Sequence, residues 1–379
     1  MATLFKQFQS VAKSDWLAKV EKDLKGKPIV GLNWEITKDL VLTPFAHADD
    51  LSEHFPPLTN QRATNNWEVG VKIQVGNMQL ANKEALNALM NGANAIAFEL
   101  SKSPSKADLK ILLKDIELEW ISTHFIFKQK SWKRFVSFFV DYVKEQGYDV
   151  GKLVNTFCFK GKLVTSPQDA DHLVEATNQL PKAKLMTINA RPLSKGTDKV
   201  VDELAQIIAR GNETLIQLNE QDLDLDKYSA QIQFSVAIGD SYFVNIAKIR
   251  ALKLLWQQVL TAWNIKDTHF NIEAHLTKTT QTDNENYNKI KATTQAMAAV
   301  IGGTQRLYIY PSDEFKDGIG TPFAQRIALN IQHLMQLESY MDRVVDPAAG
   351  SYYIENLTNQ LAETVWKRFQ ELYGLRGEN

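Results

Sequence analysis

Cysteine is almost absent from this sequence. Its 379 residues include a single cysteine, Cys158, so the chain can form neither an internal disulfide nor a cluster of thiolate metal ligands. Cys158 stands in the apolar run 154–159, without the basic neighbours that activate a thiol, and we expect it to be a small core residue. This cysteine usage favours a reducing, cytoplasmic environment.

The sequence also lacks an excess of charge of either sign and has no long apolar run. Lysine and arginine total 43 against 44 for aspartate and glutamate. The net charge of −1 provides no excess of positive charge to bind the phosphates of nucleic acid. No stretch approaches the ~18 apolar residues of a membrane-spanning helix, and the first residues show no signal-peptide pattern. We therefore expect no nucleic acid and no membrane among the partners of this chain.

The usual fingerprints of nucleotide, metal and hydrolase chemistry are missing. Gly302 and Gly303 lack the spacing of a phosphate-binding loop and are expected to end a helix. Neither H-E-x-x-H nor G-x-S-x-G occurs. His269 and His275 would lie on one face of a strand as structural residues, because no carboxylate or thiol is placed to complete a metal site. The sequence predicts no metal ligand.

The chain divides into an arm and a larger unit. A short amphipathic helix is expected over residues 14–24, with Ser14 as its N-cap, and extended segments follow at 43–45 and 55–57. We interpret residues 1–50 as an N-terminal arm that contacts a partner subunit. Large aromatic residues must be buried on the chain itself or on a partner. Those of the arm are Trp16, Trp34 and Phe45.

Residues 51–379 alternate short β-rich runs with longer helical patterns, which is typical of repeated βα units around a parallel sheet. The predicted fold class is therefore α/β, a (β/α)8 TIM barrel. A helix is expected over residues 323–340, where apolar residues recur at helical spacing. The candidate strands are residues 67–73, 95–100, 185–189, 270–274 and 307–310.

Four segments resemble the methylmalonyl-CoA mutase family. Residues 343–358, RVVDPAAGSYYIENLT, resemble the segment that closes the family's barrel, and residues 326–332 resemble the helix before it. Residues 246–256 are similar to the family's arginine-rich helix that ends in Leu-Trp, and residues 23–27 also belong to the pattern. These segments occur in the expected order over nearly the whole chain, which is identified as a member of this family.

The resemblance implies a barrel whose axis is threaded by the coenzyme A tail, with a separate cobalamin-binding domain above its C-terminal face. The family's cobalt-binding Asp-x-His-x-x-Gly loop has no match in this sequence. No cofactor is therefore expected in this chain, and adenosylcobalamin is expected in a partner large subunit.

The positions that match the family's catalytic residues are altered. Gly-Val-Lys at residues 70–72 replaces the Arg-Gln-Tyr of catalytic members, and residues 189–196 lack their tyrosine and histidine. Glu273 replaces an arginine and would repel an anionic substrate. The radical rearrangement requires donors on the thioester carbonyl and a dry cavity, so we assign no catalytic residue. The predicted vestigial active-site positions are Lys72, Arg191, Pro192 and Glu273.

Three functions remain open. In the first, the chain is the small, non-catalytic subunit of a heterodimeric mutase and supports the large subunit that interconverts methylmalonyl-CoA and succinyl-CoA. In the second, a degenerate barrel still binds a coenzyme A ester with Lys72, Arg191 or Lys195 at its mouth, although solvated surface is the simpler interpretation of these residues. In the third, a separate cobalamin-binding chain completes an active mutase half, which the changes at Lys72 and 191–192 disfavour.

Overall fold

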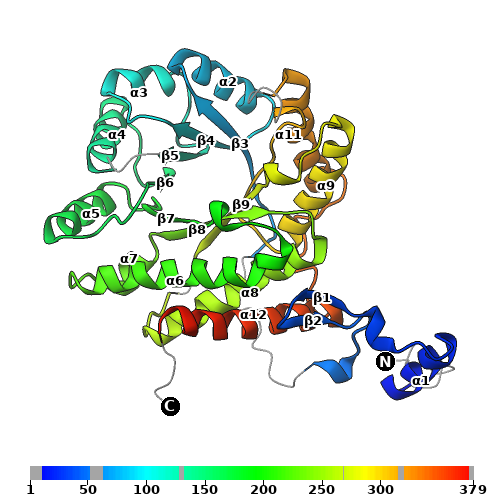
Figure 1. The fold of residues 1–379 in the computed structure, drawn as a ribbon. Helices are drawn as coiled ribbons and strands as arrows, with labels where there is room; N and C mark the ends of the chain where they lie inside the picture. The colour runs from blue at the N-terminus through cyan, green and yellow to red at the C-terminus, as the bar shows by residue number, and fades with distance from the viewer. Residues whose placement is uncertain (1–10, 52–62, 128–131, 268, 315–319, 375–379) are drawn as a thin grey trace, which may run out of the picture.

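Eight parallel strands form a nearly closed barrel surrounded by helices, as predicted (Figure 1). The computed structural model describes residues 11–51, 63–127, 132–267, 269–314 and 320–374. Neighbouring strands follow the order β6-β5-β4-β3-β10-β9-β8-β7. Their bounds are β3 Glu68–Val75, β4 Ala95–Leu100, β5 Ser122–Phe127, β6 Val154–Cys158, β7 Met186–Asn189, β8 Ile232–Ile238, β9 Asn271–Leu276 and β10 Arg306–Tyr308.

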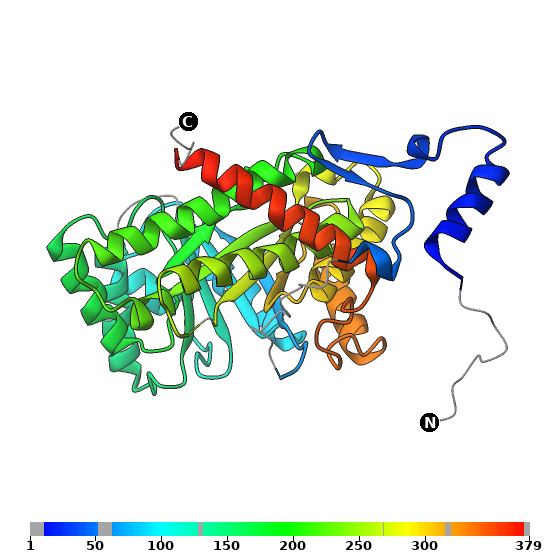
Figure 2. The ribbon, with the colours of Figure 1, turned by 90° about the horizontal axis from the view of Figure 1, so that it is seen from below.

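Helices cover the outside of the barrel and bury the outward face of each strand. Every residue of β8 is buried, as expected for a parallel strand that is covered on both faces. The long C-terminal helix α12 lies across α6 and α8 (Figure 2). The helix bounds are α2 Met78–Met90, α3 Lys106–Leu112, α4 Trp132–Gln146, α5 Pro167–Gln179, α6 Val200–Asn219, α7 Leu225–Ser229, α8 Tyr242–Ala262, α9 Glu285–Ile301, α11 Pro322–Leu337 and α12 Tyr352–Leu372.

The N-terminal arm extends away from the barrel (Figures 1 and 2). Helix α1 (Lys13–Asp23) leads to a hairpin of β1 (Trp34–Thr37) and β2 (Leu40–Leu42), and β2 contacts α12. The helix was predicted at nearly these bounds, but the predicted N-cap was wrong. The helix begins one residue before Ser14, at Lys13, with Ala12 at the capping position. The predicted extended segment 55–57 lies outside the described residues.

Several local predictions can be compared with the structure. Helix α9 ends at Ile301, and Gly303 follows with a φ of +84°, as predicted for glycines that end a helix. The prediction that His269 shares a strand face with His275 was wrong, because β9 begins at Asn271 and His269 is exposed before it. In the part of the chain that the structure describes, no helix is long and apolar enough to cross a membrane.

Candidate functional site

The barrel axis is occupied by a layer of charged and aromatic side chains. Glu273 on β9 lies at its centre, with one carboxylate oxygen 3.1 Å from His275 Nε2 and the other 3.0 Å from His124 Nδ1. Arg306 on β10 approaches the same carboxylate to 3.6 Å, and the ring of Tyr308 stacks on His275 at 4.4 Å. All five residues are almost completely buried. Side chains of the protein therefore fill this level of the axis.

Charge within this layer is compensated internally. Burial alone would raise the pKa of Glu273, but the imidazoles of His124 and His275 hold it well below its usual range. Burial, followed by the nearby guanidinium of Arg191, lowers the pKa of His275 to about 3, so this histidine is neutral at pH 7. The carboxylate of Glu273 is then balanced chiefly by Arg306, which also forms an ion pair with Glu68 at 2.5 Å.

An apolar layer with a buried thiol lies next to the charged one. Ala97, Ile126, Cys158 and Tyr308 form a small cluster that is separate from the main core. The prediction that Cys158 is a core residue is confirmed, since its side chain is buried and burial raises the pKa of its thiol to about 12. The thiol is therefore protonated and unreactive at neutral pH.

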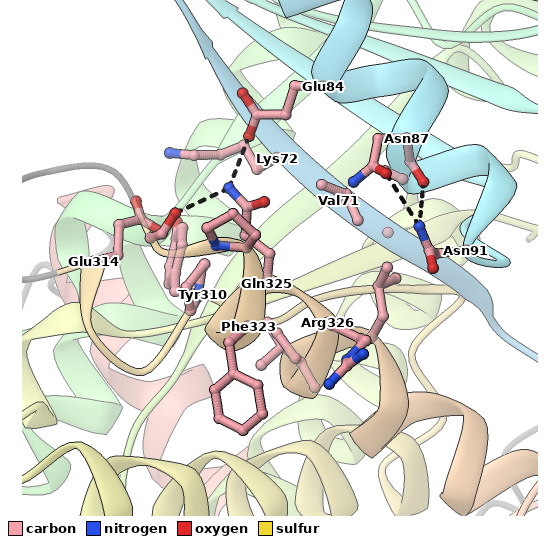
Figure 3. Close-up of a pocket in the computed structure, with 18 of the residues that line it drawn as sticks. Val71, Lys72, Glu84, Asn87, Asn91, Tyr310, Glu314, Phe323, Gln325 and Arg326 are labelled. Carbon is pink, nitrogen blue, oxygen red and sulfur yellow. Dashed lines mark hydrogen bonds between the residues drawn. The ribbon is translucent and has the colours of Figure 1, made fainter.

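Lys72 lies beside a cavity of about 460 Å³ between α2 and α11, at the C-terminal end of β3 (Figure 3). Its ammonium group donates to a carboxylate oxygen of Glu99 at 2.5 Å and lies 5.1 Å from the ring centre of Tyr310. Only 8% of the Lys72 side chain is exposed, so its interpretation as solvated surface was wrong. The charge of Lys72 is neutralised within the protein and is not free to hold an anion.

Polar side chains line the rest of this cavity. Gln325 on α11 donates to a carboxylate oxygen of Glu84 on α2 at 3.3 Å (Figure 3). Burial, followed by the charge of Glu314, raises the pKa of Glu84. Glu314 itself forms an ion pair with Lys278. The wall of the cavity carries two carboxylates, Glu84 and Glu314, and two cations, Lys72 and Arg326, so it has no net positive charge to attract an acidic ligand.

The segment after β7 holds the other predicted positions. Arg191 is partly buried, and its Nε donates to Asn189 Oδ1 at 3.1 Å. The charge of Arg191 lowers the pKa of His275 in the barrel axis. Lys195 is exposed, as expected of a surface residue, and Pro192, which was predicted as a vestigial active-site position, is exposed as well. The structure thus gathers Lys72, Arg191 and Glu273 around the axis and leaves Pro192 and Lys195 outside it.

His124, Arg306 and Tyr308 were missed by the sequence analysis, although they surround Glu273. Each stands in a segment with strong β character, and a buried strand seldom carries a charged residue without a partner. That rule could have singled out Arg306. Within the described ranges, no group of three or more histidine, cysteine, aspartate or glutamate side chains is arranged to hold a metal ion.

Comparison with known proteins identifies the class to which this barrel belongs. The family model described as methylmalonyl-CoA mutase matches residues 103–377, and the chain belongs to this family. It is 32% identical to the methylmalonyl-CoA mutase small subunit of Porphyromonas gingivalis, over 97% of this chain and 63% of that protein. It is 29% identical to the methylmalonyl-CoA mutase of Rhizobium meliloti, over 96% of this chain and 58% of that protein. The chain therefore spans about three fifths of the length of these relatives.

The methylmalonyl-CoA mutase large subunit of Porphyromonas gingivalis is also similar to this chain. It is 27% identical over 72% of this chain and 40% of its own length. The organism that holds the similar small subunit therefore holds a similar large subunit as well.

Proposed function

We propose that this chain is the small subunit of a cytoplasmic, heterodimeric methylmalonyl-CoA mutase. In this role it supports a large subunit that binds adenosylcobalamin and interconverts methylmalonyl-CoA and succinyl-CoA. The observation that carries the proposal is the buried layer around Glu273, because protein side chains occupy the place where a substrate of this family would pass. The likeness to a small subunit over 97% of the chain supports the same role.

The same layer argues against the two alternatives. A coenzyme A ester that enters the axis would have to separate Glu273 from Arg306 and displace the stacked rings of His275 and Tyr308. Removing one partner of a buried ion pair costs about 3–5 kcal/mol, and the entering ligand would carry negative charge towards a carboxylate. An active mutase half would also need donors for the thioester carbonyl, whereas Lys72 is paired with Glu99.

The arm offers a surface for the large subunit. Helix α1 stands clear of the barrel (Figure 2). The stacking of Trp16 on Phe45, at 4.1 Å between ring centres, and an ion pair between Lys13 and Asp50 connect it to the rest of the arm. Further along, the arm carries exposed apolar side chains. Side chains of this kind form the centre of a protein interface, where a bound partner buries them. They are Val30, Leu32, Trp34 and Val41, with 69%, 48%, 42% and 41% of their surface exposed.

Mutase activity tests the catalytic part of the proposal. The purified chain is assayed with adenosylcobalamin and methylmalonyl-CoA, alone and after mixing with the large subunit from the same genome. We expect no turnover by this chain alone, and co-purification with an active large subunit in the mixture. Turnover by the chain alone would refute the supporting role and make Lys72 and Arg191 candidates for catalysis.

Arm substitutions test the interface. Val30→Asp/Leu32→Asp places two charges on the arm, and we expect the dissociation constant for the large subunit to rise about tenfold or more, because an apolar side chain buried at an interface contributes about 1.5–3 kcal/mol. The matched control is Leu80→Asp/Met90→Asp on α2, where two apolar side chains outside the arm are at least as exposed. Equal binding by the arm variant and the wild type would show that the arm does not contact the partner.

A further inference from the structure

The barrel wall opens at one seam, between β6 and β7. These strands form no ladder, and a backbone bridge joins them where Lys184, two residues before β7, pairs with Thr156 in the middle of β6. Further along, the Thr187 hydroxyl donates to the Phe157 carbonyl oxygen at 2.7 Å. At the C-terminal ends of the two strands, the wall gives way to a cavity of about 740 Å³, which we name the seam pocket.

The seam pocket has largely apolar walls. It reaches from the inward-facing Cys158 to helix α6 in the outer layer of the molecule. Its volume is within the range of ~300–1,000 Å³ that is typical of small-molecule sites. The walls carry apolar side chains that are themselves buried. These side chains line the cavity and do not fill it. These are Phe127, Phe159, Val164, Met186, Ile188 and Leu218.

Cations surround the mouth of this pocket. Lys160 and Lys162 lie on the loop after β6, Arg210 lies on α6, and Glu213 is the one acidic residue among the described lining residues. Glu213 accepts from Lys162 at 2.5 Å, and Arg210 donates to the uncharged carbonyl oxygen of Asn189 at 3.3 Å. Three cations and one carboxylate leave a local charge of +2, although the whole chain carries −1. Lys160 and Arg210 have no carboxylate partner among the described residues.

We propose that the seam pocket binds a medium-chain aliphatic carboxylate. The chain would occupy the apolar cleft, and the carboxylate would pair with Lys160 and Arg210 at the mouth. A carboxylate fits better than a phosphate, because the part of α6 that lines the pocket is its C-terminal half, residues 210–218, which presents no free helix N-terminal amides to cradle a phosphate. The site is separate from the layer around Glu273 and does not depend on the subunit role proposed above.

Calorimetric titration of the full chain with sodium decanoate, below its micellar concentration, tests this site. We expect saturable binding of one decanoate per chain, and a dissociation constant that is about tenfold higher or more for Lys160→Gln/Arg210→Gln, because hydrogen bonds to charged groups are stronger than neutral ones. Both positions are exposed, so this variant is expected to fold. The matched control is Lys182→Gln/Arg343→Gln, which removes the same charges from exposed positions outside the pocket lining.

Three further titrations make the outcome decisive. Thr214→Trp on α6 fills the cleft and should abolish binding, and decanol, which lacks the charge, should bind at least tenfold more weakly than decanoate. Absence of saturable binding, or equal affinity of the wild type and Lys160→Gln/Arg210→Gln, would overturn the proposal. Tighter binding of decyl phosphate than of decanoate would overturn the assignment of the carboxylate head.

Discussion

Arg250 on α8 holds the segment that leads into α12 in place, and its replacement tests how much this buried ion pair stabilises the fold. Its guanidinium donates to both carboxylate oxygens of Asp346, at 3.1 and 3.0 Å, and to both of Glu355, at 3.1 and 2.9 Å. A fifth hydrogen bond reaches the hydroxyl of Thr358 at 3.1 Å. Only 4% of the Arg250 side chain is exposed, so both carboxylates depend on it for neutralisation.

Arg250→Met keeps most of the side-chain volume and leaves Asp346 and Glu355 without their cation. Removing one partner of a buried ion pair costs about 3–5 kcal/mol. Because 9% of the Asp346 side chain and 20% of that of Glu355 are exposed, water relieves part of the penalty, and we expect a loss near the lower limit, about 3 kcal/mol. Arg250→Lys keeps the charge without the bidentate geometry and should lose roughly half as much.

Urea unfolding followed by circular dichroism measures these losses as shifts of the transition midpoint. The matched control is Arg368→Met on α12, which removes an arginine whose side chain is 41% exposed and should cost about 1 kcal/mol or less. Adding Asp346→Asn and Glu355→Gln to Arg250→Met should recover much of the loss, because no unpaired carboxylate remains. Equal midpoints for Arg250→Met and Arg368→Met would refute the reasoning.

Three further predictions concern stability under the same urea assay. Gly211→Ala should cost about 1–3 kcal/mol, because a Cβ there would lie 2.5 Å from the ring of Trp256, whereas Gly239→Ala meets no atom within 4 Å and should change little. Since burial raises the pKa of Glu84, Glu84→Gln should be neutral or stabilising by about 0.5 kcal/mol at pH 7 and lose that gain at pH 4. His275 has a pKa of about 3 when folded against 6.5 ordinarily, so the unfolded chain binds more protons between these values. Stability should therefore fall as the pH drops below 6.5, and less so in His275→Gln.

The fold could be predicted further than the surroundings of the site. The candidate strands at 67–73, 95–100, 185–189, 270–274 and 307–310 correspond to β3, β4, β7, β9 and β10. Strands β5, β6 and β8 were not predicted, because they carry buried polar residues such as His124, Asn155 and Gln233. An apolar run is the main signal for a buried parallel strand, and a polar barrel axis interrupts it.

Glu273 could be singled out from the sequence, but its partners could not. His124 lies on β5 and Arg306 on β10, and only closure of the barrel brings them to one carboxylate. The sequence therefore predicted an unpaired charge that repels anions, whereas the structure surrounds it with a guanidinium and two imidazoles. The prediction that placed His269 on a strand was wrong because strand β9 begins at Asn271, two residues after His269.

Two cavities at the C-terminal side of the barrel share a physical origin. Strand β3 has eight residues and its paired neighbour β10 has three, whereas β6 has five residues and β7, across the seam, has four. Where the shorter strand stops pairing, the wall parts, and a cavity of about 460 Å³ lies beside β3 and one of about 740 Å³ beside β6. The buried layer around Glu273 fills the axis at its level, so the unfilled volume at the C-terminal side lies beside these shorter strands. Ligand binding by this chain is therefore expected through the barrel wall and not along its axis.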